Sequence, residues 1–279
     1  MHVDYQIQRT EHTCAISVGD IRITAIRESF VNAPSGMLVQ GEGLPVPEVP
    51  ASKISINCFL VETPDALVLI DTGLGGQEAE FSGRLIKELC NLGKKPEDIS
   101  HVFFTHLHAD HFGGAIDEDG VSLFPRSVFV AHPLERDFLF VGKVPFGNEA
   151  VMQQFNAAQR LNGVLPQFEW LTPGQMLPGI EMVHLPGHTP GHSGFRIESQ
   201  GETVLLWGDI VHAPDWQFSD TGIGVSFDVN ARLAEETRRN TMRQVAEAEQ
   251  IIAGTHTDMP GFGRLKASGA GYRFVPLAD

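Results

Sequence analysis

A dense group of residue types that bind metals lies between positions 106 and 111. The run Thr105-His106-Leu107-His108-Ala109-Asp110-His111 places three histidines and one aspartate within six residues. Imidazole nitrogens and carboxylate oxygens are ligands for zinc, manganese or iron, and a single catalytic ion usually takes three protein ligands. A lone buried histidine is more often a hydrogen-bonded core residue, but burying four such groups without an ion would leave several of them unsatisfied. The run therefore predicts a site for two metal ions.

Three further residues could complete a site for two ions, each near a glycine at the expected end of a strand: His188, Asp209 and His256. Glycine permits tight turns and a close approach of the backbone. The predicted metal ligands are therefore His106, His108, Asp110, His111, His188, Asp209 and His256. We expect four other histidines to be structural, namely His101, His132, His184 and His192.

Short apolar segments alternate with helical stretches, which favours a layered α/β architecture. The segments 21–26, 54–61, 66–70 and 102–104 are expected strands, and the last of them runs directly into the histidine run. Apolar residues at helical spacing between Phe81 and Cys90 predict a helix that stops at Gly93.

The second half of the chain repeats this order. Strands are expected at 182–185, 194–197 and 203–207, followed by a helix over roughly 231–249 that Asp228 or Asn230 could cap. The segments 66–73 and 203–209 look alike, since each is a buried strand that ends on an aspartate. This likeness predicts two related halves packed face to face.

The whole chain, residues 1–279, is expected to form a single domain with a helical and loop insertion at about 133–166. Phe138, Leu139, Phe140, Phe146 and Phe155 lie in this insertion. Two interpretations stay open. The insertion is either plain packing, or a lid or homodimer surface near the site.

Composition excludes several classes of protein. The net charge of -15 disfavours a nucleic-acid or anionic-membrane partner, because phosphate binding needs clustered Lys and Arg. Three cysteines without CxxC spacing predict neither a disulfide framework nor a thiolate zinc site, and they suit a reducing cytoplasm. The sequence begins without a signal-like segment and contains no long apolar run, so we expect neither secretion nor membrane insertion.

The HxHxDH run and the segment Pro186-Gly187-His188-Thr189-Pro190-Gly191-His192 resemble the metallo-β-lactamase superfamily over about residues 53–260. This resemblance implies an αββα sandwich of two similar halves, with the metals at one edge between the sheets. It also implies the division of ligands between the ions. His106, His108 and His188 would hold the first metal, Asp110, His111 and His256 the second, Asp209 would bridge both, and Asp71 would orient the ligands from behind.

Other features narrow the branch of the superfamily. Flavo-diiron proteins of this fold usually carry Glu at the position of His108, which disfavours an electron-transfer role. Metallo-β-lactamases proper commonly lack an aspartate at the position of Asp209, which disfavours antibiotic hydrolysis. Glyoxalase II enzymes share the GHTPGH segment but use a basic C-terminal region, which this chain lacks. The stretches 207–212, 226–229, 260–263 and 272–276 resemble the branch of methyl parathion hydrolase and related lactonases. Many of those lactonases carry Tyr where this chain has His212.

The resemblance implies a hydrolase with two divalent ions, zinc being the first expectation and manganese, iron and cobalt the alternatives. Two ions about 3.5 to 4 Å apart can share a hydroxide, which would attack a lactone, carboxylic ester or phosphotriester. Asp110 or Asp209 could carry a proton to the leaving group, and His212 could donate to the substrate or brace Asp209. Phe112, Trp216 and Phe218 could line an apolar pocket.

Three other functions occur among proteins that share this fold or this histidine pattern. A thioester hydrolase of the glyoxalase II type would use the same chemistry, because pocket shape decides the substrate. A non-catalytic metal-binding scaffold is disfavoured because all seven candidate ligands are present. A nuclease is disfavoured by the acidic charge balance.

Overall fold

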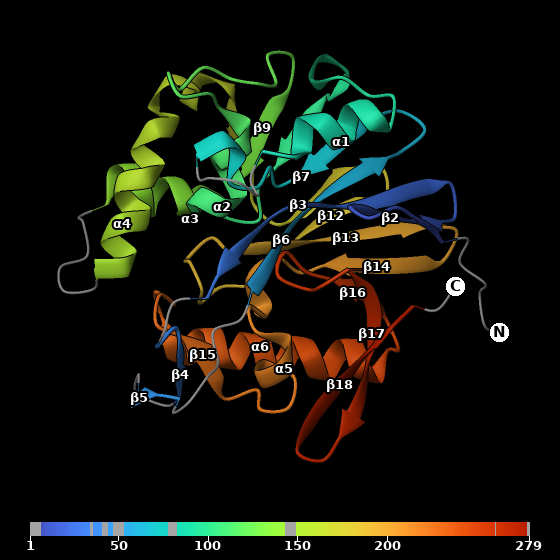
Figure 1. The fold of residues 1–279 in the computed structure, drawn as a ribbon, viewed down its shortest axis with the longest axis vertical. Coiled ribbons are helices and arrows are strands. Elements are labelled where there is room, and N and C mark those ends of the chain that lie inside the picture. The colour runs from blue at the N-terminus through green and yellow to red at the C-terminus, as the bar shows by residue number, and fades with distance from the viewer. Residues whose placement is uncertain are drawn as a thin grey trace.

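Two large sheets pack face to face, with helices on their outer surfaces (Figure 1). The computed structural model describes residues 7–33, 36–40, 44–46, 53–77, 83–142, 149–259 and 261–277. The first sheet has the strand order β1 (Gln8–Arg9), β2 (Thr13–Val18), β3 (Ile21–Asn32), β6 (Lys53–Glu62), β7 (Leu67–Ile70), β8 (His101–Phe103), β9 (Val128–Ala131) and β10 (Phe168–Trp170).

The second sheet repeats the pattern of an antiparallel region that continues into a parallel pair. Its order is β11 (Gly174–Leu177), β12 (Ile180–His184), β13 (Ser193–Ser199), β14 (Glu202–Leu206), β16 (Ile251–Ala253), β17 (Phe262–Ser268) and β18 (Gly271–Pro276). A small third sheet joins β15 (Ile223–Val225), β4 (Leu38–Gln40) and β5 (Leu44–Pro45).

The helices cover the outer faces of the two large sheets. Figure 1 shows α1 outside the first sheet and α5 and α6 outside the second. The α-helices are α1 (Leu85–Asn91), α2 (Ala109–Phe112), α3 (Pro133–Arg136), α4 (Glu149–Ala158), α5 (Pro214–Gln217) and α6 (Ala231–Glu247). Short 3-10 and π turns are η1 (Gly75–Gln77), η2 (Pro96–Asp98), η3 (Gly113–Ala115), η4 (Asp137–Val141), η5 (Gln159–Gly163), η6 (Leu165–Gln167) and η7 (Gly208–Ile210). The expected αββα sandwich is thereby confirmed.

Strand direction brings the ends of distant segments to one edge. β7 and β8 are parallel, with Ile70 opposite Phe103, and β14 and β16 are parallel, with Leu206 opposite Ala253. The carboxyl ends of each pair therefore lie side by side. The loops that leave these ends carry the histidine run, Asp209 and His256, so the two sheets deliver the predicted ligands to a common edge.

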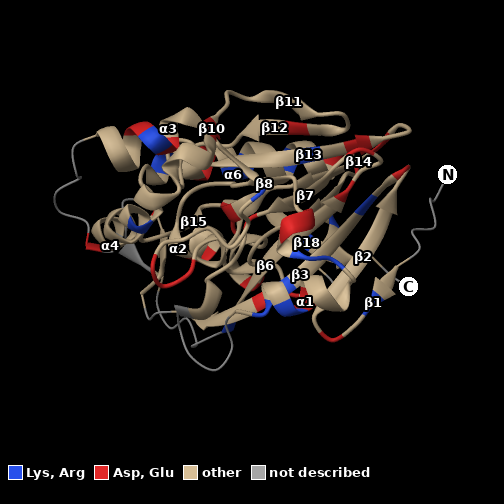
Figure 2. Cartoon of the chain, turned by 90° about the horizontal axis from the view of Figure 1, so that it is seen from above, with Lys and Arg blue, Asp and Glu red and all other residues tan. Residues whose placement is uncertain are grey.

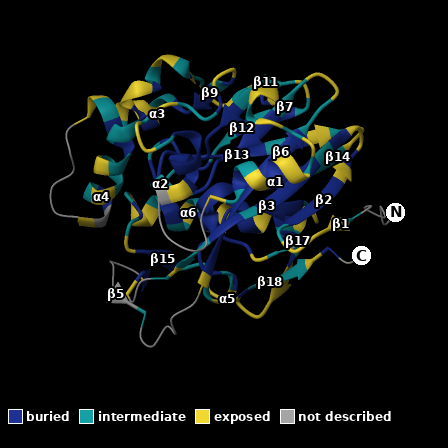
Figure 3. Ribbon diagram, turned by 45° about the horizontal axis from the view of Figure 1, so that its top comes forward, coloured by how far each residue is buried: buried dark blue, intermediate teal, exposed yellow. Residues whose placement is uncertain are grey.

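The core between the sheets is formed by alternating strand residues from both. Phe59 and Phe103 of the first sheet and Phe195 and Leu206 of the second belong to one buried cluster. The rings of Phe103 and Phe195 stack at 5.4 Å between centroids. Burying one such side chain contributes about 1.5–3 kcal/mol. Buried residues concentrate in these strands, whereas exposed residues lie on the outer helices (Figure 3).

The expected helices differ from the structure at their ends. α1 begins at Leu85, and residues 81–82 of the predicted helix lie outside the described residues. α6 is capped by Asn230, whose Oδ1 accepts a hydrogen bond from Leu233 N at 3.1 Å. Asp228 is not the cap, because its carboxylate is turned toward His188.

The described part of the 133–166 segment packs against the protein interior. Phe138, Phe140 and Phe155 are partly buried against the core cluster that covers the outer face of the first sheet. Phe146 lies outside the described residues. Gln154 of α4 accepts a hydrogen bond from Ala109 N at 3.2 Å, which fastens α4 to the histidine run.

Charged residues of both signs are interspersed along the chain (Figure 2). Several form ion pairs, such as Lys94 with Glu62 at 2.5 Å. Exposed or half-exposed pairs of this kind contribute little to stability. Among the described residues, no helix has the length and apolar character needed to cross a membrane.

Candidate metal centre

All seven predicted ligands come together at the edge where β8 and β14 end. The histidine run forms the loop after β8 and the start of α2, while His188 lies between β12 and β13. Asp209 lies in η7, and His256 follows β16. The six side chains other than Asp110 are buried, and Asp110 keeps 23% of its side chain exposed.

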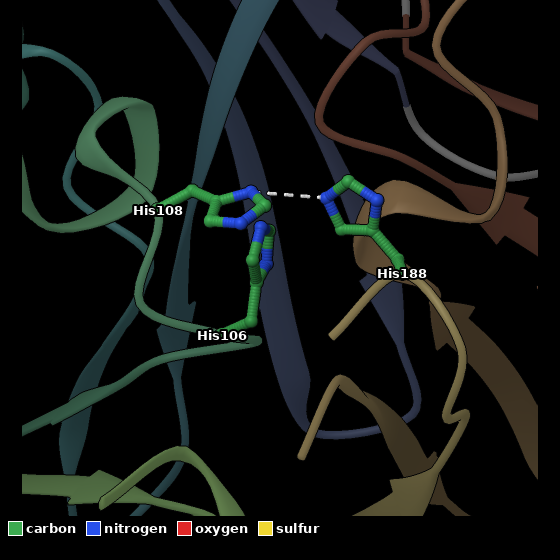
Figure 4. A group of neighbouring side chains, drawn as sticks. All are labelled: His106, His108 and His188. Carbon is green, nitrogen blue, oxygen red and sulfur yellow. Dashed lines mark hydrogen bonds between the residues drawn. The ribbon is translucent and has the colours of Figure 1, made fainter. Parts of the chain in front are cut away.

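Among the described residues, four overlapping sets of three residues have their ligand atoms within 4.8 Å of one another, and two of these sets share no residue with each other. The other two contain Asp209, together with His106 and His111 in one and with His188 and His212 in the other. His106, His108 and His188 make the first group, in which His188 Nε2 lies 3.1 Å from His108 Nδ1 (Figure 4). Asp110, His111 and His256 make the second.

Asp209 connects the two groups through one oxygen. Its Oδ2 lies 3.2 Å from His111 Nε2 and 3.2 Å from His256 Nε2 in the second group. The same atom lies 3.4 Å from His188 Nε2 and 3.7 Å from His106 Nε2 in the first. This is the position that a shared ligand of two ions would need.

Unpartnered buried atoms indicate that these residues fit a pair of cations. His106 Nε2, His111 Nε2 and Asp209 Oδ1 are buried and make no hydrogen bond. Buried polar atoms normally have a partner, and a divalent ion would satisfy all three. The donor set of imidazoles and carboxylates matches zinc and related metals.

Burial and neighbouring charges set the protonation of the ligands. Burial lowers the pKa values of His106, His108 and His188 well below the usual value, so these imidazoles are neutral and free to bind a metal. Burial alone would raise the pKa of Asp209, but the surrounding imidazoles, foremost His111, hold it well below its usual value. Asp209 is therefore a carboxylate.

Asp71 contacts an imidazole of the second group on the side away from the other ligands. Its Oδ2 lies 2.8 Å from His111 Nδ1, which leaves Nε2 of that ring directed into the site. Thr105 donates to both carboxylate oxygens, from N at 2.9 Å and from Oγ1 at 2.8 Å. Asp71 has a left-handed backbone (φ 58°), a strained conformation that the surrounding hydrogen bonds hold in place.

Two further imidazoles have supports that the sequence did not reveal. His188 Nδ1 lies 2.8 Å from Asp228 Oδ1, and His256 Nδ1 lies 2.9 Å from the carbonyl oxygen of Ser55. The sequence separations are 40 and 201 residues, so no local pattern could indicate these contacts.

Glu135 is a buried carboxylate that joins two of the loops that carry predicted ligands, the loop after β8 and the loop between β12 and β13. Its Oε2 accepts from Leu107 N at 3.0 Å, and its Oε1 accepts from Thr189 Oγ1 at 2.6 Å and Gly191 N at 2.8 Å. Burial raises the pKa of Glu135, and these hydrogen bonds oppose the rise. Leu107 stands between two predicted ligands and Thr189 follows a third, so Glu135 fixes the first group as a unit.

His212 lies beside the metal groups. Its Nε2 is 3.0 Å from Asp209 Oδ2, yet neither ring nitrogen makes a well-oriented hydrogen bond. The ring stacks on His256 at 4.9 Å between centroids and meets the edge of Phe227 at 5.3 Å.

A cavity of about 260 Å³ opens directly onto these groups. His108, Asp110, Asp209, His212 and His256 line it on the metal side. The remaining wall is mostly apolar and consists of Val31, Met37, Ile54, Leu74, Ala109, Gln154 and Phe227. A second cavity of about 490 Å³ shares Ile54, His212 and His256 with the first and extends along α5.

The aromatic residues expected in the pocket have different locations. Trp216 lines the second cavity. Phe112 does not line either cavity, because its fully buried ring belongs to the core cluster outside the first sheet. Phe218 packs outside the second sheet, stacked on Phe274 at 5.6 Å. Phe227, which the sequence did not single out, takes the place of Phe112 in the wall.

His192, which we expected to be structural, lies beside the site and uses both ring nitrogens in hydrogen bonds within the protein. His192 Nδ1 donates to Leu185 O at 2.7 Å, and its Nε2 accepts from Asp209 N at 2.9 Å. Both nitrogens are occupied, and burial lowers the pKa of the ring to about 4. His192 therefore holds the backbone of Asp209.

The fold and the two connected ligand groups agree with one family of proteins. The model of the metallo-beta-lactamase superfamily matches residues 52–256, and the chain belongs to this superfamily.

Curated relatives carry a more particular name. An N-acyl homoserine lactonase from Bacillus thuringiensis is 24% identical over 219 residues, which cover 71% of this chain and 79% of that protein. An N-acyl homoserine lactonase from a Bacillus species is 27% identical over 175 residues, which cover 55% of this chain and 62% of the relative. The match thus spans less than two thirds of that relative.

Solved structures share the fold over nearly the whole chain. The dizinc quorum-quenching lactonase AidC, in complex with a product, has a TM-score of 0.87 at 23% identity and covers 96% of this chain and 98% of its own. The hydrolase AbOPH of the beta lactamase superfamily has a TM-score of 0.84 at 24% identity and covers 98% of this chain and 99% of its own. These likenesses are evidence for the fold.

Proposed function

We propose that the chain is a hydrolase with two divalent metal ions that opens lactones, with N-acyl homoserine lactones as the first class to test. The observation that carries this proposal is the pair of ligand groups sharing Asp209 at the base of a small, mostly apolar cavity. Zinc is the first metal to test, because the donor set suits it and AidC is described as dizinc.

The residues of the site divide the work of hydrolysis between them. The ions, when bound, would supply an activated water and polarise the substrate carbonyl. Hydrolysis adds water across the acyl C–O bond, and the ring oxygen that leaves must gain a proton. We assign that transfer to Asp110, whose partly exposed carboxylate lines the cavity beside His256. His212 would direct an N–H toward the substrate oxygen.

The two cavities, which share Ile54, His212 and His256 in their walls, suit a substrate with two parts. The metal-side cavity has room for a small ring or ester head, while the second cavity beyond Ile54 could receive an acyl chain beside Trp216. A phosphotriester could present the same oxygen atoms to the metals, so substrates of both kinds belong in the test.

A substrate panel tests this function on the zinc-loaded protein. We expect turnover of an N-acyl homoserine lactone to exceed that of an aryl ester, a phosphotriester and S-lactoylglutathione, because pocket shape selects among substrates of one hydroxide chemistry. Initial rates from pH titration or chromogenic release would measure each. A faster phosphotriester or thioester would replace the lactone as the substrate, and turnover that survives complete removal of metal by a chelator would refute the metal-dependent mechanism.

His212→Phe is expected to keep two metals but to lower kcat by about 10²–10⁴-fold, the range that positioned proton donors contribute. Phenylalanine preserves the packing on His256 and Phe227 while removing both ring nitrogens. Metal content by elemental analysis and kcat with KM on the best substrate would be measured together. Loss of metal in parallel with activity would instead assign His212 to bracing Asp209.

A further inference from the structure

The two ligand groups share a second feature beyond Asp209. In the second group, His111 is backed by the carboxylate of Asp71. In the first group, His188 is backed in the same way by Asp228, with Nδ1 and Oδ1 2.8 Å apart. Each proposed metal would therefore have one imidazole whose rear nitrogen faces a buried carboxylate.

The orientation of His188 follows from this contact. When Nδ1 donates its proton to Asp228, Nε2 carries the lone pair. Nε2 is the nitrogen that faces His108 Nδ1 at 3.1 Å and Asp209 Oδ2 at 3.4 Å. The carboxylate thus selects the tautomer that can bind a metal at this point.

Asp228 is held for this role by groups on the far side of its carboxylate. Its side chain is 2% exposed, and its Oδ2 accepts a hydrogen bond from Val225 N at 3.3 Å. Burial raises the pKa of Asp228, and the neighbouring His212 and the buried guanidinium of Arg238 oppose this rise. Arg238 is itself fixed by Nε, which donates to Thr221 O at 3.0 Å.

The backbone around His188 has its own supports. Val229 N donates to His188 O at 3.0 Å, and Asn230 N donates to Gly187 O at 2.9 Å. Phe227 packs its ring against the imidazole at 5.7 Å. These contacts hold the backbone of residues 187 and 188 independently of the carboxylate, so we expect the contact between Asp228 and His188 to act on the ring.

We propose that Asp228 is a positioning residue for the first metal, which it serves by fixing the tautomer, orientation and basicity of His188. The proposal rests on the metal centre of the proposed function, and it assigns to the first group the kind of support that Asp71 gives to the second. Removal of a hydrogen-bond partner behind a ligating histidine typically lowers metal affinity by about 10–100-fold.

Zinc binding to the metal-free protein, measured by competition with a chromophoric chelator, tests this role without any substrate. We expect Asp228→Ala to lower the affinity of one zinc by about 10–100-fold while the other changes by less than about threefold. Asp228→Asn should have a smaller effect, because an amide oxygen can still accept from Nδ1 but carries no charge. When cobalt replaces zinc, the absorption spectrum of Asp228→Ala should differ from that of the wild type for the ion at the site that contains His188.

Asn230→Ala is the matched control, since it lies in the same segment and removes the cap of α6 without touching the imidazole. It should lower the thermal midpoint and leave both zinc affinities unchanged. Wild-type affinity for both ions in Asp228→Ala, or equal weakening by Asn230→Ala, would overturn the proposal. If Asp228→Ala does not fold, unchanged affinities in Asp228→Asn would overturn it. Absence of lactone turnover with the expected zinc pattern would refute the proposed substrate and leave this role standing.

Discussion

Asp209→Asn is expected to release at least one of the two metals and to lower hydrolysis by about a thousandfold or more. The Oδ2 atom of Asp209 lies 3.2 Å from His111 Nε2 and 3.4 Å from His188 Nε2, so it is the group best placed to contact both ions. The amide keeps the size of the side chain but removes the charge that balances two cations. Metal catalysis supplies several kcal/mol, and each 1.36 kcal/mol corresponds to a tenfold change in rate.

Elemental analysis and initial rates on the same preparation would measure both effects. Asp65→Ala is a suitable control, because Asp65 lies exposed in the turn between β6 and β7, far from the ligands in the fold. Two bound metals and full turnover in Asp209→Asn would contradict the shared-ligand role.

Glu135→Ala is expected to destabilise the fold by about 3–9 kcal/mol, since three buried groups lose their partner and each such group costs about 1–3 kcal/mol. The substitution removes the acceptor for Leu107 N, Thr189 Oγ1 and Gly191 N, all of which are buried. Activity should fall as well, because the two loops that carry the first ligand group lose their common anchor. Urea unfolding of the metal-free protein would measure the first effect.

Glu135→Gln separates the hydrogen bonds from one another. Its amide oxygen can replace Oε1 toward Thr189 and Gly191, but its NH₂ group opposes the N–H of Leu107, so an intermediate loss is expected. The exposed Glu118→Ala should stay within about 0.5 kcal/mol of the wild type. A Glu135→Ala protein as stable as the wild type would show that the loops hold their register without the carboxylate.

The strands could be predicted from sequence better than the ends of the helices. β6 and β13 include the segments expected for them, and β7 and β14 agree with theirs to within one residue at either end, because runs of buried β-branched and aromatic residues depend little on distant context. Expected strand ends shifted by a residue or two where pairing decided the boundary, as at β8 and β12. The sequence offered both Asp228 and Asn230 as the cap of α6. Asn230 is the cap, because the carboxylate of Asp228 contacts His188 instead.

The pocket was the least predictable part of the site. The sequence does not show whether an aromatic residue beside a ligand faces the core or the substrate. Phe112 turned into the core and Phe227 into the cavity. The direction of α2 decides where Phe112 points. The small sheet, whose strand β15 precedes residues 226–229, decides where Phe227 points.

Residue type and spacing by themselves indicated a metal-dependent hydrolase, since three histidines and an aspartate within six positions are costly to bury without an ion. The sequence also indicated the ends of β14 and β16 as the sources of the remaining ligands. Only the tertiary structure decided which groups stand behind those ligands. Asp228 and Glu135 reach their partners across 28 to 56 residues of chain, and such contacts are set by the packing of two sheets and not by any local pattern.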